Sequence, residues 1–138
     1  MTEDKTKYQE LENEILKLKL ELKIQGEIIN KIPIPFFVKD KDFKYLNCND
    51  AFVNYLGLPK PKLINSTNYD VLSKELADKY YIADCKLRDG LENQIYESKV
   101  VYSDGTLHDI IFHKARLINE KNEFYGIIGF MLDITANK

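Results

Sequence analysis

The chain has 138 residues, of which 44% are hydrophobic and 30% are charged, and its formal net charge is −2. This length allows one folded domain with an appendage, and the weak negative charge predicts no attraction to nucleic acid or to an anionic membrane. No apolar run approaches the ~18 residues of a membrane span. Cys48 and Cys85 have no paired spacing, which favours reduced thiols in a cytoplasmic protein.

Residues 1–32 are predicted to form a long amphipathic helix. Their apolar residues recur at alternating spacings of three and four, as in a coiled-coil seam. We expect this seam to pair two subunits through Leu11, Ile15, Leu18, Leu22 and Ile29. A second stripe, from Leu16 to Ile28 in steps of four, indicates that the last turns also lie against a globular domain. The alternative is an ordinary amphipathic helix packed on the core of a monomer.

Short strands and a helix are expected after the first proline. Pro33 ends the leader helix because it forces extended backbone before and at its own position. Strands are predicted at Phe36–Lys39 and Phe43–Cys48. A helix is predicted at Asn49–Leu56, capped by its first residue and ended by Gly57.

The rest of the chain is read as helices followed by strands. A loop containing Pro59 leads to helical turns near Tyr69–Leu72 and to a longer helix at Lys74–Arg88. Three strands are then predicted at Gln94–Tyr102, Leu107–Ile118 and Phe124–Leu132. Two strands, then helices, then three strands define an α+β domain with an antiparallel sheet.

Several short motifs follow one another in a characteristic order. They are Lys39-Asp40, Tyr45-Leu46-x-x-Asn49-x-Ala51-Phe52, Leu56-Gly57-Leu58, Asn68-Tyr69-Asp70-Val71-Leu72, Asp104-Gly105, Gly126-x-x-Gly129 and Asp133-Ile134-Thr135. On these residues the chain resembles the PAS family of sensor domains from about residue 32 to 135. The resemblance implies a five-stranded antiparallel sheet in the order 2-1-5-4-3, with helices cupped over one face. It also implies an amphipathic helix lying on the other face.

This arrangement agrees with the pattern of the longest strand. Leu107–Ile118 carries apolar residues on both of its faces, whereas a half-solvated antiparallel strand alternates with polar residues. We therefore expect both faces of the sheet to be covered, the second by the N-terminal helix or by another subunit. The expected domains are a leader helix at 1–32, a PAS sensor domain at 33–135 and the start of a linker to an output domain at 136–138.

The candidate ligand pocket is the inside of the cup. Strand 94–102 has Tyr96 and Ser98 on its predicted inward face. The resemblance adds other polar groups that could face the cavity, and the candidates are Tyr55, Tyr69, Tyr96, Ser98 and His113. A filled core with tyrosine hydroxyls at its rim is the alternative.

No catalytic or metal-binding set is found. His108 and His113, the two histidines, are five apart on one strand, so their side chains leave opposite faces and cannot share a metal ion. The helix at 74–88 lacks the histidine with which related domains hold haem. Cys48 lies outside the position of the reactive cysteine of flavin-binding light sensors. Haem and covalent flavin chemistry are therefore disfavoured, and the identity of any other cofactor stays open.

The resemblance implies a signal-sensing and dimerisation module, not an enzyme. The expected context is a larger cytoplasmic signal-transduction protein, such as a two-component histidine kinase or a diguanylate cyclase. Asp133, Ile134 and Thr135 would pass the state of the domain to an output domain in cis. A ligand-free dimerisation scaffold is the alternative, and a small α+β enzyme that uses His113 is a further one.

Overall fold

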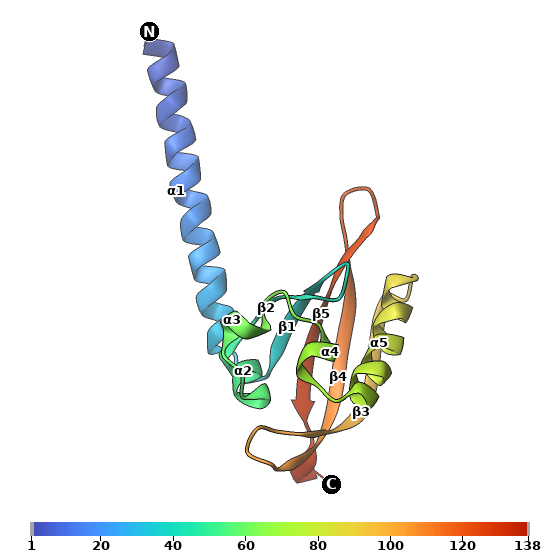
Figure 1. Cartoon of the computed structure of the whole chain (residues 1–138). Helices are drawn as coiled ribbons and strands as arrows, with labels where there is room; N and C mark the ends of the chain where they lie inside the picture. The colour runs from blue at the N-terminus through green and yellow to red at the C-terminus, as the bar shows by residue number, and fades with distance from the viewer. Residues whose placement is uncertain (1, 138) are drawn as a thin grey trace.

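A single five-stranded antiparallel sheet forms the centre of the computed structural model, which describes residues 2–137 (Figure 1). Its strands are β1 (Phe36–Asp40), β2 (Tyr45–Cys48), β3 (Asn93–Val101), β4 (Leu107–Ile118) and β5 (Phe124–Asp133). Their order across the sheet is β2-β1-β5-β4-β3, and every neighbouring pair is antiparallel. The predicted strand order is thus confirmed.

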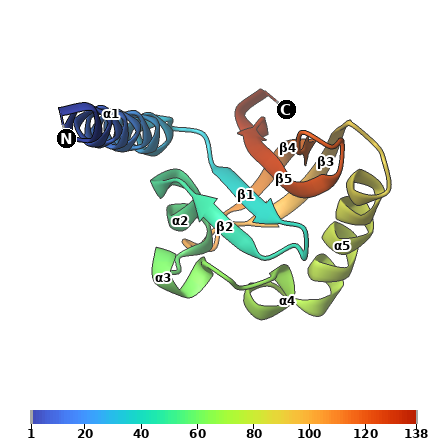
Figure 2. The same ribbon diagram turned by 90° about the horizontal axis from the view of Figure 1, so that it is seen from above.

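The helices belong to the leader and to the segment between β2 and β3. They are α1 (Thr2–Lys31), α2 (Asp50–Leu56), α3 (Lys60–Leu63), α4 (Asn68–Val71) and α5 (Lys74–Arg88), with a 3₁₀ turn η1 at Thr135–Asn137. Figure 2 shows α2 to α5 around one side of the sheet, which forms the cup. Residues 1 and 138, the outer ends of the predicted leader and linker, lie outside the described residues.

Most predicted bounds agree with the structure to within one residue, and two larger differences have local reasons. β2 begins at Tyr45 and not at Phe43, because Phe43 adopts a left-handed φ of 65° in the turn after β1. The region read as a loop around Pro59 contains the short helix α3. Pro61 lies in its first turn, where a proline has no intrahelical N–H bond to lose.

The core lies between the sheet and the cupped helices. Side chains on the inner face of the sheet are largely buried, among them Phe37, Val100, Ile110, Phe112 and Met131. Gly129 of β5 faces Phe37 of β1 across the strand pair. A Cβ atom at Gly129 would collide with the Phe37 ring, so the glycine allows this ring to lie flat over the floor of the cup.

Asn49 joins the exit of α1 to the start of α2. Its Oδ1 accepts hydrogen bonds from Phe52 N (3.1 Å) and Phe36 N (3.0 Å). Its Nδ2 donates to Ile34 O (2.8 Å) and Ile32 O (3.2 Å). The predicted helix cap is confirmed, and the same fully buried amide also holds the segment that follows the leader helix.

The leader helix does not lie on the outer face of its own sheet, so of the two expected covers, this helix or another subunit, the first is wrong for the single chain. No described residue of α1 is buried, and Figures 1 and 2 show it extending away from the domain. The chain bends at Pro33 and Ile34 before entering β1, which directs the helix away from the sheet. In the single chain the outer face is therefore open: Ile95 is 65% exposed, Leu132 42% and Phe130 37%.

Candidate functional site

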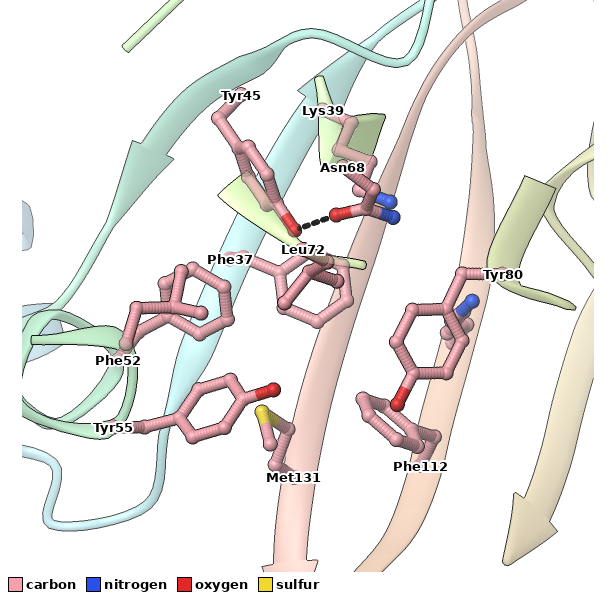
Figure 3. Close-up of a pocket in the computed structure, with 12 residues that line it drawn as sticks. Phe37, Lys39, Tyr45, Phe52, Tyr55, Asn68, Leu72, Tyr80, Phe112 and Met131 are labelled. Atoms are coloured by element: carbon pink, nitrogen blue, oxygen red, sulfur yellow. Dashed lines mark hydrogen bonds between the residues drawn. The ribbon is translucent and has the colours of Figure 1, made fainter. Parts of the chain in front are cut away.

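The inside of the cup is an aromatic chamber with little free space. Its cavity measures about 20 Å³, which is room for roughly one water molecule. Figure 3 shows the side chains that converge on it from the sheet and from the helices. The lining is Phe37, Lys39, Tyr45, Phe52, Tyr55, Leu56, Asn68, Leu72, Tyr80, Phe112, Lys114 and Met131.

Three buried charged side chains meet beside this cavity. Lys39 of β1 and Lys114 of β4 point to Asp84 of α5, with Nζ–O distances of 2.7 Å and 2.8 Å. The side chains of all three are at most 2% exposed. Two ammonium groups share one carboxylate, so the cluster carries one excess positive charge inside the protein.

Burial and mutual attraction act in opposite directions on these groups. Burial alone would raise the pKa of Asp84, but the two ammonium groups outweigh it and lower that pKa below its ordinary value. Burial also lowers the pKa of Lys114 to about 8, although Asp84 favours the charged lysine. Lys114 is therefore poised to release its proton far more easily than a surface lysine.

Aromatic rings surround the two ammonium groups. Lys114 Nζ lies 4.9 Å from the centre of the Tyr96 ring and 5.6 Å from that of Tyr80. Lys39 Nζ lies 5.2 Å from the centre of the Tyr45 ring and 5.4 Å from that of Phe37. Ring faces attract cations but do not neutralise them, so the cluster keeps its excess positive charge.

Hydrogen bonds between polar side chains brace the chamber. Tyr45 Oη donates to the buried amide oxygen of Asn68, which fastens α4 over β2 (Figure 3). On the other side, Ser98 Oγ lies 3.3 Å from Tyr80 Oη and accepts from Lys79 Nζ at 3.0 Å. Burial raises the pKa of Tyr80 to about 12, so its hydroxyl keeps its proton at physiological pH.

The predicted pocket residues fall into three groups. Tyr55 lines the cavity. Ser98 and Tyr96 lie on the inner face of β3 as expected. Ser98 makes the contacts with Lys79 and Tyr80 described above, and Tyr96 is stacked on Phe112 with a ring-centre distance of 5.2 Å. The buried Tyr96 hydroxyl has no hydrogen-bond partner among residues 2–137.

Tyr69 and His113 lie outside the chamber. Tyr69 is 46% exposed and donates a hydrogen bond to Asp78 Oδ1 at 2.6 Å, beside a separate small pocket. His113 is exposed on the outer face of the sheet, so its expected place in the cup is wrong. The reason is the alternation of β4: Phe112 and Lys114 face inward, which turns His113 outward.

Sequence reasoning missed Lys39, Asp84 and Lys114, although a signal for the lysines was present. Each lysine lies two residues after a buried phenylalanine on its strand, Phe37 or Phe112, and so shares its inward face. Asp84 is on the buried side of α5 together with Tyr80 and Leu87. Charged side chains are mostly solvated in proteins, so the inward register of two lysines does not by itself predict a buried cluster.

The predicted exit residues form a compact turn at the end of β5. Asp133 Oδ1 accepts from Thr135 Oγ1 at 2.6 Å and from Thr135 N at 3.0 Å. Thr135 Oγ1 in turn accepts from Asp109 N of β4 at 2.9 Å. Asp133 Oδ2 lies 2.6 Å from His108 Nδ1. The exit of the central strand β5 is thus tied to its neighbour β4.

Other expectations about chemistry concern metals, cysteines and membranes. Within residues 2–137 no group of three His, Cys, Asp or Glu side chains is placed to hold a metal ion. Cys48 is buried, and this burial raises the pKa of its thiol, which makes it less reactive. None of the described helices combines the length and apolarity needed to cross a membrane.

A comparison with protein families identifies the domain. Residues 29–138 match the family described as PAS fold. The chain belongs to the PAS family. The PAS fold is a sensory and signalling fold and is not itself catalytic, and PAS domains commonly dimerise and bind ligands.

Similar proteins agree with this assignment. An uncharacterised protein of Sinorhizobium fredii, y4lL, is 31% identical over 110 residues, which are 78% of this chain but 13% of y4lL. This chain therefore corresponds to a small part of that relative.

Solved PAS structures share the fold at lower identity. The PAS domain of Bordetella pertussis BvgS is 24% identical with a TM-score of 0.70, and the match covers 83% of this chain and 87% of that one. Vibrio cholerae VqmA without its target DNA is 22% identical with a TM-score of 0.74, covering 82% of this chain and 51% of that one. A structure of VqmA bound to DPO is 21% identical with a TM-score of 0.71, covering 79% and 56%.

Proposed function

We propose that this PAS domain is the sensing and dimerisation segment of a larger signal-transduction protein, such as a histidine kinase or a diguanylate cyclase. Its input would be a small molecule in the cup, and its output domain would follow Asp133-Ile134-Thr135 in the same chain. The match of this chain to only 13% of y4lL is compatible with such a multidomain context.

The observation that carries the proposal is the charged cluster in the aromatic cup. Burying an ion carries a penalty of several kcal/mol even after relaxation of the protein. Two such groups, Lys39 and Lys114, line the cavity, and their partner Asp84 lies beside it, where apolar side chains would stabilise the fold at least as well. Perturbed ionisable groups concentrate at functional sites, and a structural neighbour, VqmA, has been solved bound to a ligand, DPO.

A homodimer is the second part of the proposal. The coiled-coil seam of α1 is uncovered in the single chain, with Leu11 63%, Leu18 49% and Leu22 69% exposed. The outer face of the sheet holds an apolar groove of about 440 Å³ that includes Ile95 and Phe130. A second copy is a suitable occupant for both surfaces.

Dimensions support this pairing. The second stripe of α1, from Leu16 to Ile28, spans about 18 Å at the rise of a helix. The sheet is about 19 Å wide, since its five strands lie roughly 4.8 Å apart. The stripe of one subunit could therefore cross the open face of the other while the seam pairs the two helices.

A ligand-free dimerisation scaffold is the competing function, and the cavity volume of about 20 Å³ favours it. A ligand larger than water must displace some of the side chains that fill the cup. The two functions share the dimer and differ only in whether the cup opens.

Native mass spectrometry of the purified domain, together with its absorption spectrum, separates the two. The sensor is expected to retain a small molecule that is released on unfolding, or to gain one from a metabolite extract. A domain whose mass stays that of the bare chain in both conditions would be a scaffold, and the sensing proposal would fail.

We also propose that the domain is cytoplasmic and does not bind nucleic acid. The two cysteines are free thiols, which fits a reducing compartment. VqmA has been solved as a complex with ligand and DNA, but the net charge of −2 of this chain offers no basic surface field for a similar contact.

A further inference from the structure

The charge balance of the cup floor points to a class of ligand. Asp84 supplies one negative charge to the two ammonium groups of Lys39 and Lys114. No acidic side chain is among the described residues that line the cavity itself. The chamber therefore presents one uncompensated positive charge to anything that enters it.

The lysines also have hydrogen-bonding capacity to spare. An ammonium group has three N–H donors, and the hydrogen bond recorded for each of these lysines within residues 2–137 is the one to Asp84. On the sheet side, Lys114 Nζ is flanked by the rings of Tyr96 and Phe112. Both ammonium groups therefore keep unused N–H donors in a chamber lined mostly by aromatic rings.

The walls set the shape of the ligand. Six aromatic side chains line the cavity: Phe37, Tyr45, Phe52, Tyr55, Tyr80 and Phe112. Rings pack well against other rings with their centres about 4.5–7 Å apart, and the small volume leaves no place for a bulky group. Met131 at the floor has an unbranched side chain that can change rotamer to admit one flat ring.

We propose that the cup binds a small planar molecule with an anionic group, such as an aromatic carboxylate, and that Lys114 Nζ binds this group. The inference rests on the proposed sensing function and deepens it. The ring would lie among the aromatic walls, and the anion would neutralise the excess charge on the floor. A neutral molecule of the same shape would leave that charge unpaired, so it would bind more weakly.

Binding is then expected to depend on pH in a defined direction. Free Lys114 has a pKa of about 8, so its protonated fraction falls roughly tenfold between pH 7 and pH 9. Affinity for the anion should fall by about the same factor. The other groups that face Lys114 are Asp84, Lys39, Tyr80 and Tyr96. The pKa of Asp84 is lowered and those of both tyrosines are raised, so these three keep their charge states over this interval.

Benzoate and benzamide are a matched pair of probes, because they share a ring and differ in charge. The chain has two methionines, so the methyl NMR signal of Met131 at the cup floor is easy to follow. We expect benzoate to shift this signal saturably at pH 7 and benzamide to bind at least tenfold more weakly. Benzoate affinity should fall about tenfold at pH 9. Lys114→Met should reduce benzoate binding to the level of benzamide, whereas Lys99→Met, at an exposed lysine on β3, should leave it unchanged.

The comparison of the two probes in the unaltered protein does not depend on the folding of any variant. Equal binding of benzamide, no binding of benzoate, or benzoate binding that Lys114→Met leaves intact would each overturn the ligand class. A neutral molecule retained in native mass spectrometry would overturn the class while supporting the sensing function. If native mass spectrometry detects only the bare chain, both before and after exposure to a metabolite extract, the proposed sensing function itself fails.

Discussion

Asp84 is shared by two ammonium groups, so the three members of the buried cluster differ in how strongly the fold depends on them. Removing Lys114 leaves Lys39 and Asp84 as a balanced pair at 2.7 Å. Removing the carboxylate leaves two buried positive charges without a counterion. Breaking a buried pair in this way destabilises proteins by about 3–5 kcal/mol.

Asp84→Asn should therefore lower the free energy of unfolding by roughly 3–5 kcal/mol. Lys114→Met, which keeps an unbranched side chain one atom shorter and removes the excess charge, should have an effect at least ~2 kcal/mol smaller. Urea unfolding at pH 7 followed by circular dichroism measures both. Equal losses for the two variants would show that the second ammonium is as necessary to the fold as the carboxylate.

Single residues also show where sequence reasoning reaches its limit. Ser98 could be placed from the alternation of its strand, and Tyr55 from the resemblance to the family. His113 was predicted to face the cup, but Lys114 does so instead. The apolar pattern of β4 is nearly the same on both faces and does not say which face the helices cover. The close approach of Lys39 and Lys114 to Asp84 joins three elements far apart in the chain, and no local pattern encodes it.

At the level of elements, the end of β5 is fixed by a side-chain turn and not by strand pairing alone. Two hydrogen bonds from Thr135 to Asp133 close this turn, and the Thr135 hydroxyl connects it to β4 through Asp109 N. Partial burial acts to raise the pKa of Asp133, but the hydrogen bonds from Thr135 and His108 outweigh it and lower that pKa. The carboxylate is thus ionised and able to accept at neutral pH.

Asp133→Ala is expected to open this turn without unfolding the domain. Loss of a hydrogen bond worth about 1 kcal/mol should speed hydrogen exchange of the Thr135 and Asp109 amides roughly fivefold. In a full-length protein the variant should uncouple output from input. NMR hydrogen exchange measures the first effect and an assay of the output domain the second.

Asn119→Ala provides the control for the exit variant. Asn119 caps the turn between β4 and β5 at the other end of the same strand pair, by accepting from Lys121 N and Glu123 N. It should loosen only its own turn. An unchanged output response in Asp133→Ala, or an equal loss in Asn119→Ala, would contradict a special role for the exit.

The elements that could be predicted well have strong local signals. The bounds of α5 match the prediction because Ser73 caps its start and Gly90 follows its end in a left-handed conformation. β4 was also placed at its observed residues, since the turn at Gly105 marks its beginning. The helix α3 was missed because the segment around Pro59 was predicted as a loop, although a proline in a first turn favours a helix start.

At the level of the whole molecule, α1 and the sheet present two separate apolar surfaces. The sequence predicted that the outer face of the sheet is covered. Periodicity does not show whether the covering element belongs to the same chain or to a second copy. The described chain leaves Phe130 37% and Leu132 42% exposed. This exposure is the physical reason to expect association.

The domain is therefore expected to be a dimer at tens of micromolar in light scattering. Leu18→Glu in the seam of α1 should weaken it about 10³-fold, because two buried leucines worth about 2 kcal/mol each are lost. Asn13→Glu adds the same charge on the side of the helix away from the seam and should leave the dimer intact. A monomeric wild type, or equal dissociation of both variants, would exclude the seam.

The amide of Asn49 has a mechanical consequence for the molecule. It holds the carbonyl groups of Ile32 and Ile34, directly after α1, and the first turn of α2 at the same time. A twist or tilt of α1 at this junction must either break these hydrogen bonds, which are worth about 1 kcal/mol each, or move the turn that carries Phe52. Movement of α1 is therefore coupled to the cup, because it would displace Phe52, one of the aromatic side chains that line the cavity.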